Sequence, residues 1–566
     1  MKKVSGAFAL IVSALSLGVQ GQQRPFSVVE ATIPQMQQAM ANQQVTSRQL
    51  VEQYLIRIAM YEDRLNAALA VNANALAEAD TLDRERAQGK LRGPLHGIPV
   101  ALKDNIHTTN MPTTGGALVF AGYVPPYEAT LTANLKAAGA IIIAKTGLTE
   151  LANWVAGNPN AMPGNYNAVG GFAFNPYDPR SDPRPEPGDG RPVLQTGGSS
   201  SGVGTAANFW AGNVGSDTGG SIISPSNANM LVGIRPTIGR ISRYGVIPIT
   251  ADHDTAGPMT KTVADAAIML GAMEGAAPDP HDAATSTCTA PPNRDYTKFL
   301  NPAGLKGKRI GVPRAFYLDR VTLPGETTPR GGINAAQAKV MADAIAVLKQ
   351  QGAIVVDPAD IPSFVAKTAA DSFPLWDFCA GAEHAKGKDE NCSINFKYGM
   401  KRDYNAWLAT LGPSAPVKTL KEHREWNIAH ARAGAIKYQQ SRFDISDEID
   451  VAADKARLDA DDAKDRRLSR DQGIDGVLKH YQLDAFITPG GSGAGIAARA
   501  GYPIIAVPYG MVPNAPQQAY PAGFNARPAP YGVGFVGAQC SEPQLIEIAY
   551  AFEQATKKRA APSLFP

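Results

Sequence analysis

Residues 196–226 read TGGSSSGVGTAANFWAGNVGSDTGGSIISPS and hold the densest pattern in the chain. Two Gly-Gly-Ser units, 197–199 and 219–221, lie 22 residues apart within it. Glycines directly before a serine allow close backbone approach and can turn several N–H groups toward one point, where they would bind an oxyanion while the serine supplies a nucleophile. The alternative is a pair of Gly/Ser-rich surface turns, although the apolar segment 208–211 favours a buried position.

A serine nucleophile needs a base, and the eight histidines are scattered without a supporting Asp or Glu motif. A lysine serves when it is neutral, which burial favours. Lys103 directly follows the apolar run 97–102 and should project from the end of a buried strand, with Asp104 facing elsewhere. The alternative is an ordinary surface lysine at a strand end.

The helix and strand patterns alternate, which is typical of an α/β architecture. Apolar periodicity predicts helices over 46–60, 73–88, 131–138 and 336–351, the first with a capping box at Thr46 and Gln49. Short apolar runs predict buried strands at 97–102, 141–144, 309–312, 353–356 and 483–488.

Several strings together resemble the amidase signature family: GIPVALKDNI (97–106), TGGSSSG (196–202) and GSDTGGSI (215–222), with 131–154, 254–267, 483–489, 500–510 and 542–556 in the same order. The resemblance covers residues 30–557. The triple serine 199–201 and the apolar pair 222–223 are similar to the bacterial peptide-amidase branch. This likeness implies an α/β fold with a mixed central β-sheet covered by helices on both faces, as a single domain over 22–566.

The resemblance also implies catalytic roles. Ser221 corresponds to the acylated nucleophile, Ser199 to a bridging serine preceded by a cis peptide bond, and Lys103 to the base that acts through Ser199. The expected reaction is hydrolysis of a carboxylic amide C–N bond. The residues expected to form the oxyanion hole or to bind substrate are Thr218, Gly219, Gly220 and Ser200.

The sequence departs from the family pattern at three places, and the third bears on the substrate. The separation of Ser199 and Ser221 is about two residues shorter than the family leads us to expect, and Lys261 stands where arginine is common. Ile223 stands where many members carry arginine, which disfavours an acidic substrate partner. We expect a neutral or apolar acyl group, as in a peptide C-terminal amide or a small acyl or aryl amide.

Composition excludes several other classes of protein. Of 566 residues, 44% are hydrophobic and 19% charged, so a large core can form. Lys plus Arg is 54 and Asp plus Glu is 51, a balance that argues against a nucleic-acid binder. Without HExxH, CxxC or zinc-finger spacing, we expect neither a metal nor a cofactor. Four cysteines allow two disulfides, Cys379–Cys392 closing the shortest loop, or isolated thiols.

The first 21 residues have the form of a secretory signal peptide, with Lys2 and Lys3 before an apolar stretch and cleavage near Gly21. That stretch is shorter than the roughly 20 residues that span a bilayer. We therefore expect a periplasmic or secreted protein without stable membrane insertion. A Pro-rich surface insertion is expected at 178–192, and a helical, charged peripheral region at 363–480.

Five other interpretations remain open. Residues 198–202 satisfy GxSxG, the nucleophile elbow of α/β-hydrolases with Ser200 as nucleophile, but Pro192–Thr196 makes a poor preceding strand. Residues 493–498 match GxGxxA without the later acidic residue of a dinucleotide site. An A-type amidotransferase subunit that works with partner proteins fits the family, and an esterase or carbamate hydrolase would use the same triad. An extracytoplasmic solute-binding protein would leave the Lys and Ser set unexplained.

Overall fold

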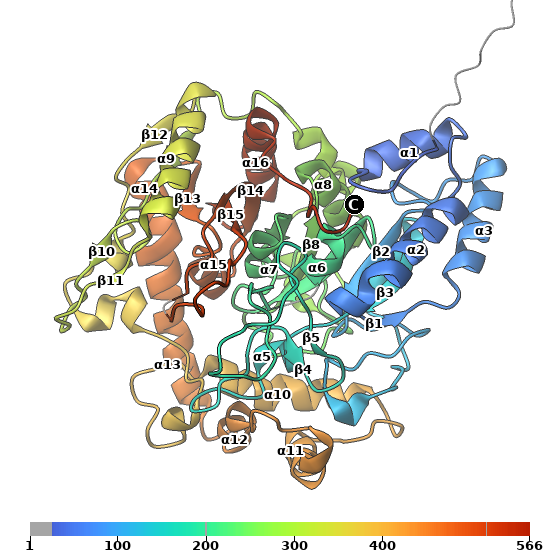
Figure 1. Ribbon diagram of the computed structural model, residues 1–566. Helices are drawn as coiled ribbons and strands as arrows, with labels where there is room; N and C mark the ends of the chain where they lie inside the picture. Colours follow the sequence, from blue (N-terminus) through green and yellow to red (C-terminus); the bar gives the residue numbers. More distant parts are fainter. Residues whose placement is uncertain (1–24, 199–200, 517) are drawn as a thin grey trace, which may run out of the picture.

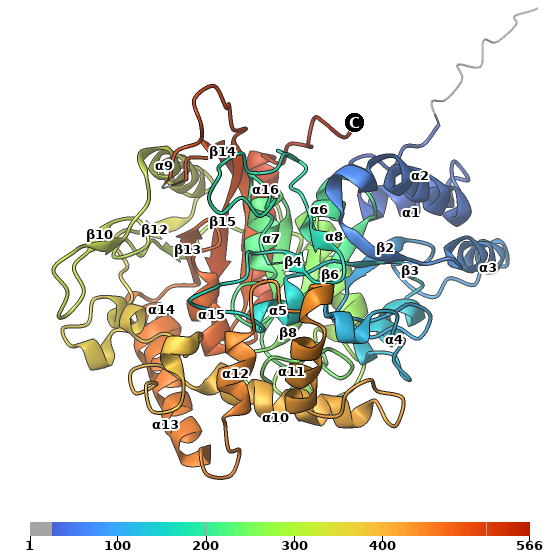
Figure 2. The ribbon, with the colours of Figure 1, turned by 60° about the horizontal axis from the view of Figure 1, so that its bottom comes forward.

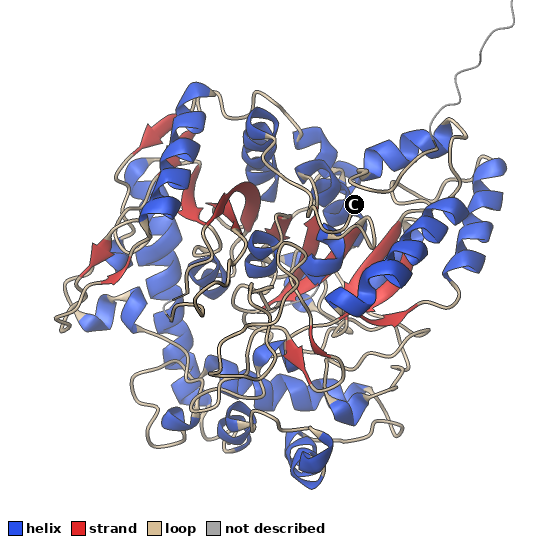
Figure 3. Cartoon of the chain, in the orientation of Figure 1, coloured by secondary structure: helices blue, strands red, loops and turns tan. Residues whose placement is uncertain are grey.

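The structure, a computed structural model, describes residues 25–198, 201–516 and 518–566. The expected signal segment 1–21 and both Ser199 and Ser200 therefore lie outside the described residues. Within those ranges eleven strands form one mixed sheet that crosses the molecule (Figures 1 and 3). The α/β expectation is confirmed. In spatial order the strands are β1 (Ala68–Val71), β3 (Ile141–Thr146), β2 (Pro99–Lys103), β6 (Gly212–Asp217), β8 (Thr255–Thr260), β7 (Val232–Arg235), β14 (Ile504–Val512), β15 (Ala529–Val536), β13 (Ala485–Pro489), β9 (Arg309–Gly311) and β12 (Ile354–Val356).

The middle of the sheet brings distant segments to one edge. β2 lies between β3 and β6 and is parallel to both, with Leu102 opposite Val214. Because parallel strands end at the same edge of a sheet, the last residue of β2, Lys103, and the end of β6 at Asp217 face the same space. β6 pairs antiparallel with β8, and β7, β14, β15 and β13 continue antiparallel before the parallel strands β9 and β12.

Helices cover both faces of this sheet, as alternation along β14 shows. Ile505 and Val507 pack into a cluster with α8, α9 and α16, while Ile504 and Ala506 pack with α14 and α15. The helices are α1 (Ile33–Ala41), α2 (Ser47–Leu65), α3 (Ala75–Ala87), α4 (Thr130–Ala137), α5 (Glu150–Asn153), α6 (Ser201–Ala206), α7 (Ile223–Ala228), α8 (Val263–Met273), α9 (Ala335–Gln350), α10 (Asn395–Thr410), α11 (Leu420–Ala429), α12 (Ser441–Asp447), α13 (Lys455–Arg466), α14 (Asp475–Tyr481), α15 (Ala494–Ala500) and α16 (Glu542–Thr556).

The elements expected from periodicity are found close to their predicted positions. The helices are α2, α3, α4 and α9, and the strands are β2, β3, β9, β12 and β13. The capping box at Thr46 and Gln49 forms, and α2 then runs on to Leu65. The apolar segment 208–211 is buried, as expected.

Helices α10 to α13 lie at the periphery. α10, α11 and α12 lie along the lower edge in Figure 1, α13 stands at the lower left, and all four come forward in Figure 2. Residues 183–190 of the Pro-rich segment are mostly exposed, and Asp189 accepts a hydrogen bond from Tyr438 in the region after α11. Two small ribbons, β4 (Tyr166–Asn167) with β5 (Gly171–Phe172) and β10 (Arg320–Val321) with β11 (Arg330–Gly331), lie outside the sheet. In the described ranges, no helix has the length and apolar character needed to cross a bilayer.

Candidate active site

Lys103 is fully buried at the end of β2, not on the surface. Its Nζ donates to Ser216 on β6, at 2.9 Å to Oγ and 3.1 Å to the carbonyl oxygen. Burial lowers the pKa of the Lys103 ammonium to about 8, against the raising effect of the Asp217 and Asp254 charges. A substantial fraction of this lysine is therefore neutral near pH 8, as a general base requires.

Asp104 faces away from Lys103, as expected. Its Oδ1 lies 3.2 Å from Nζ of Lys145 on β3, and its Oδ2 accepts the N–H of Thr114 at 2.9 Å. The carboxylate next to Lys103 in sequence is thus paired with a different cation.

Ser221 lies in a tight turn between β6 and α7 that Asp217 organises. The two carboxylate oxygens of Asp217 accept the N–H groups of Gly220 and Ile222, each at 2.7 Å. Gly220 has φ of +132°, a conformation that side chains rarely permit, so glycine is needed there. The Gly220 N–H thus has an acceptor within the protein, Asp217, and its expected part in the oxyanion hole stays a prediction.

The same turn holds two other backbone donors. Among the described residues, the N–H groups of Gly219 and Ser221 donate to no protein acceptor, and both residues line the main cavity. Thr218 also lines the cavity, but its hydroxyl donates inward to Oδ1 of Asp254 at 2.5 Å. Asp254 is fixed in turn by the N–H groups of Ile249 and Thr250, at 2.9 and 3.0 Å, and so holds the start of the turn.

Gly198, which precedes Ser199 in the sequence, lies directly beside Ser221. A Cβ built on Gly198 would lie 3.1 Å from Oγ of Ser221, so the backbone of Gly198 passes next to that hydroxyl. On the other side Ser201 exchanges a hydrogen bond of 2.8 Å with Thr146, at the end of β3. Gly198, Ser201 and Ser221 therefore lie near the edge where β2, β3 and β6 end. The expected cis bond before Ser199 lies outside the described residues.

The local structure is unlike a nucleophile elbow. Over Pro192–Thr196 the described chain makes only an isolated bridge between Pro192 and Ser181, with no strand leading into the GxSxG sequence. An elbow requires that strand.

A cavity of about 880 Å³ opens over Ser221. Its wall is rich in aromatic rings, and its charged residues are Arg330, Arg442, Arg499 and Asp377. Phe396 reaches the turn that carries Ser221, since a Cβ on Gly219 would lie 3.9 Å from its Cζ. The aromatic residues of the wall include Trp154, Tyr317, Phe364, Phe373, Phe378 and Phe396.

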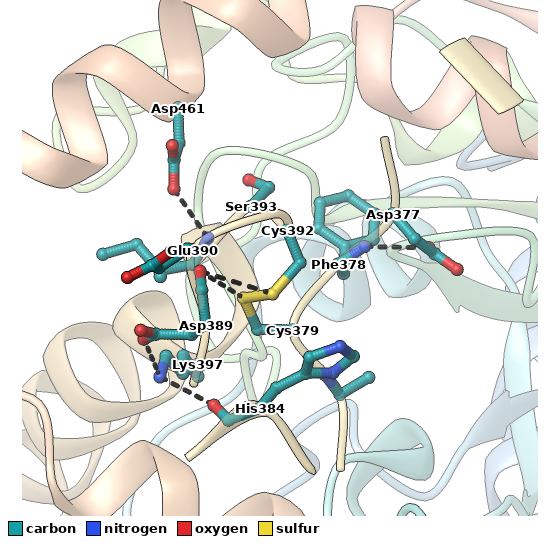
Figure 4. Close-up of a disulfide and its surroundings, with 12 residues drawn as sticks. Asp377, Phe378, Cys379, His384, Asp389, Glu390, Cys392, Ser393, Lys397 and Asp461 are labelled. Atoms are coloured by element: carbon teal, nitrogen blue, oxygen red, sulfur yellow. Dashed lines mark hydrogen bonds and ion pairs between the residues drawn. A yellow bond between two sulfur atoms is a disulfide. The ribbon is translucent and has the colours of Figure 1, made fainter. Parts of the chain in front are cut away.

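A disulfide lies directly behind this wall. Cys379 bonds to Cys392, and Phe378 precedes the first of these cysteines (Figure 4). Phe378 stacks on Phe396 with ring centroids 3.8 Å apart. A second disulfide joins Cys288 to Cys540, so all four cysteines are paired. The sequence analysis did not predict this aromatic wall, because its residues belong to segments without a motif. The sequence feature that could have indicated it is Phe378, directly before Cys379.

The described part of the chain contains no group of three or more His, Cys, Asp or Glu residues arranged to hold a metal ion.

Comparison with known proteins gives consistent relatives. A family model described as Amidase matches residues 49–546. A probable amidase of Arabidopsis thaliana is 33% identical over 561 residues, which cover 98% of this chain and 95% of the relative. The A-type subunit of glutamyl-tRNA(Gln) amidotransferase from a Synechococcus species is 31% identical, covering 92% and 96%. The X-ray structure of native peptide amidase from Stenotrophomonas maltophilia superposes with a TM-score of 0.78 at 34% identity, covering 95% of this chain and 99% of that one.

Proposed function

Because the chain belongs to the amidase family and is an amide-hydrolysing enzyme, we propose that it cleaves carboxylic amide C–N bonds through an acyl-enzyme on Ser221. The likeness to the peptide-amidase branch, expected from the sequence, is confirmed by the superposition on the Stenotrophomonas maltophilia enzyme. The observation that carries the proposal is a buried lysine and a cavity-lining serine at one sheet edge, with Gly198 beside the serine.

In the proposed acylation, Ser221 Oγ attacks the amide carbon while its proton passes to Ser199, which gives its own proton to neutral Lys103. The carbonyl oxygen becomes an oxyanion, which the N–H groups of Gly219 and Ser221 would stabilise. The C–N bond then breaks, and the proton held by Lys103 returns through Ser199 to the departing nitrogen. Ammonia or an amine leaves.

Deacylation uses the same relay with water in place of Ser221. Water gives a proton through Ser199 to Lys103 as its oxygen attacks the ester carbon. The proton then returns to Ser221 when the ester bond breaks, and the acid leaves.

The substrate we propose has a neutral or apolar acyl part, such as a peptide C-terminal amide. The aromatic wall supports this, and Ile223, two residues after the proposed nucleophile, is fully buried and offers no cation to an acidic group. A cavity of about 880 Å³ also exceeds what a simple aliphatic amide would fill. This substrate preference is tested by comparing turnover of peptide amides, short aliphatic amides, anilides and carbamates. We expect peptide amides to be turned over fastest.

Two alternatives use the same residues. The relative from Synechococcus is one part of an amidotransferase, and a protein of that kind would need partner proteins. Turnover of a simple amide by the purified chain alone separates the two functions. Higher kcat/KM on esters or carbamates than on amides would favour an esterase or carbamate hydrolase.

The proposal includes an extracytoplasmic location. Disulfides persist in oxidising compartments, and both cysteine pairs are bonded. The signal-like residues 1–21 support the same location. Expression with this segment, followed by fractionation and N-terminal sequencing, should give a mature chain that begins near residue 22.

A fluorophosphonate that reacts with active serines tests the nucleophile. Peptide mapping should place the adduct on Ser221, and Ser221→Ala should abolish labelling. Ser200→Ala should retain labelling and lose only part of the rate. Ser199→Ala should fall between Ser221→Ala and Ser200→Ala in both labelling and rate. An adduct on Ser200 would reject the proposed relay and restore the nucleophile-elbow reading.

A further inference from the structure

We propose that Asn105 is a positioning residue that keeps the hydroxyl of Ser216 as a hydrogen-bond acceptor toward Lys103, so that the Lys103 lone pair stays free to take a proton. This inference rests on the proposed role of Lys103 as the base.

The three side chains meet in the interior behind the catalytic turn. Asn105 lies two residues beyond Lys103, and its Nδ2 donates to Oγ of Ser216 at 2.8 Å. Nζ of Lys103 donates to the same oxygen at 2.9 Å. All three residues are buried. The carbonyl of Asn105 accepts the N–H of Ile247 at 2.8 Å, which fixes the backbone from which the amide reaches Ser216.

The number of hydrogen-bond donors and acceptors determines which way the Ser216 hydroxyl proton points. A neutral amine has two N–H bonds and one lone pair, and Lys103 has two acceptors in place, the Oγ and the carbonyl oxygen of Ser216. A serine hydroxyl has one proton and accepts through two lone pairs. With Lys103 and Asn105 both donating to Oγ, these lone pairs are occupied, and the Ser216 proton points away from both nitrogens.

Removal of the amide frees the hydroxyl to rotate. Its proton then points at the lone pair of Lys103, in competition with the proton that the relay must deliver. Asn105 thus acts on Lys103 only through Ser216.

The neutrality of the amide also matters. The charged groups that act on Lys103 are Asp217 and Asp254, both of which favour its ammonium form. A carboxylate at position 105 would add a third charge of this sign and raise the pKa of Lys103 further. An amide fixes the hydroxyl without that effect.

The test compares Asn105→Ala, Asn105→Asp and a matched control, Asn213→Ala. Asn213 is a buried amide on β6 whose side-chain atoms have no hydrogen-bond partner among the described residues. For each variant, kcat and kcat/KM are measured from pH 6 to pH 10 together with a thermal melt. We expect Asn105→Ala to lower kcat about 10- to 100-fold, because the rotated Ser216 hydroxyl no longer accepts a hydrogen bond from Lys103, which becomes charged in the reaction. The acid limb is the part of the pH–rate profile in which the rate falls as the pH is lowered. The nearly isosteric Asn105→Asp should shift this limb to higher pH by about one unit or more. Asn213→Ala should change neither kcat nor the position of the acid limb.

A double-mutant cycle with Ser216→Ala tests the path of the effect. Without the Ser216 hydroxyl there is nothing to orient, so Asn105→Ala should cause no further loss in that background. Two results would overturn this inference and leave the base assignment intact. One is that the losses of kcat in the two single variants multiply in the double variant. The other is that Asn105→Ala keeps the wild-type kcat and acid limb while Lys103→Ala is inactive. Activity and acid limb retained in Lys103→Ala would instead reject the proposed function itself.

Discussion

Oδ1 of Asp217 lies 3.2 Å from Nε of Arg235, and both side chains are fully buried. The same carboxylate accepts the N–H groups of Gly220 and Ile222, on either side of Ser221. Arg235 belongs to β7, so one carboxylate ties the turn that carries the proposed nucleophile to the middle of the sheet.

Asp217→Ala should therefore damage stability and activity together. Loss of one partner leaves a buried unpaired guanidinium, which costs about 3–5 kcal/mol. Displacement of the turn by about 1 Å would reduce kcat about 100-fold. Asp217→Asn keeps a similar shape and should lose less of each. Urea unfolding and kcat measure both effects; a variant with wild-type stability would show that the carboxylate does not anchor the turn.

Lys103→Ala should give a folded protein whose activity is lower by several orders of magnitude, because members of a catalytic relay act as a unit. In the wild type, protonated Lys103 cannot accept a proton, so the rate should rise with pH through the lysine pKa of about 8 and stay high above it. The residual activity of Lys103→Ala should lack this acid limb. Retention of the limb would identify another group as its source.

Phe396→Ala should change substrate preference more than the chemistry. The ring stacks on Phe378 and reaches the turn that carries Ser221, so its loss opens the wall next to that serine. We expect KM for a peptide ending in phenylalanine amide to rise at least about tenfold, with a smaller change for alanine amide, since burial of a large apolar side chain is worth about 1.5–3 kcal/mol. Equal effects on both substrates would place the acyl group elsewhere in the cavity.

The double variant Cys379→Ser, Cys392→Ser tests the support behind this wall. Its disulfide closes a loop with a sequence separation of 13 and follows directly after Phe378. We expect a loss of stability of about 3 kcal/mol and a higher KM for aromatic substrates. The matched control, Cys288→Ser with Cys540→Ser, removes a disulfide that does not border the main cavity, and should lower stability with KM unchanged. An unchanged KM in the first variant would show that Phe378 holds its position without the disulfide.

Much of the fold was accessible from local pattern. The buried run before Lys103 predicted β2, and the periodicity of residues 336–351 predicted α9. The strands β6 and β8 were not predicted. β6 reads GNVGSD, with glycine and polar residues that disfavour strands, and its pairing on both sides outweighs this weak propensity.

Some residues of the candidate site could likewise be predicted from the sequence, and others could not. Lys103 and Ser221 carry a sequence signal because they stand beside an apolar run and a Gly-Gly pair. The use of the Gly220 N–H by Asp217 could not be predicted, because it depends on the path of the backbone through the turn. The aromatic wall depends on long-range packing between segments that no local pattern joins.

The bond between Cys288 and Cys540 has a sequence separation of 252, and the loop it closes includes β13, β14 and β15. A single protease cut at the exposed residues 412–414 would therefore yield two pieces that remain covalently joined. They would migrate as one species on a gel without reductant and as two with it. After denaturation the pieces would meet again as parts of one molecule, so their reassembly rate should be independent of protein concentration until the bond is reduced.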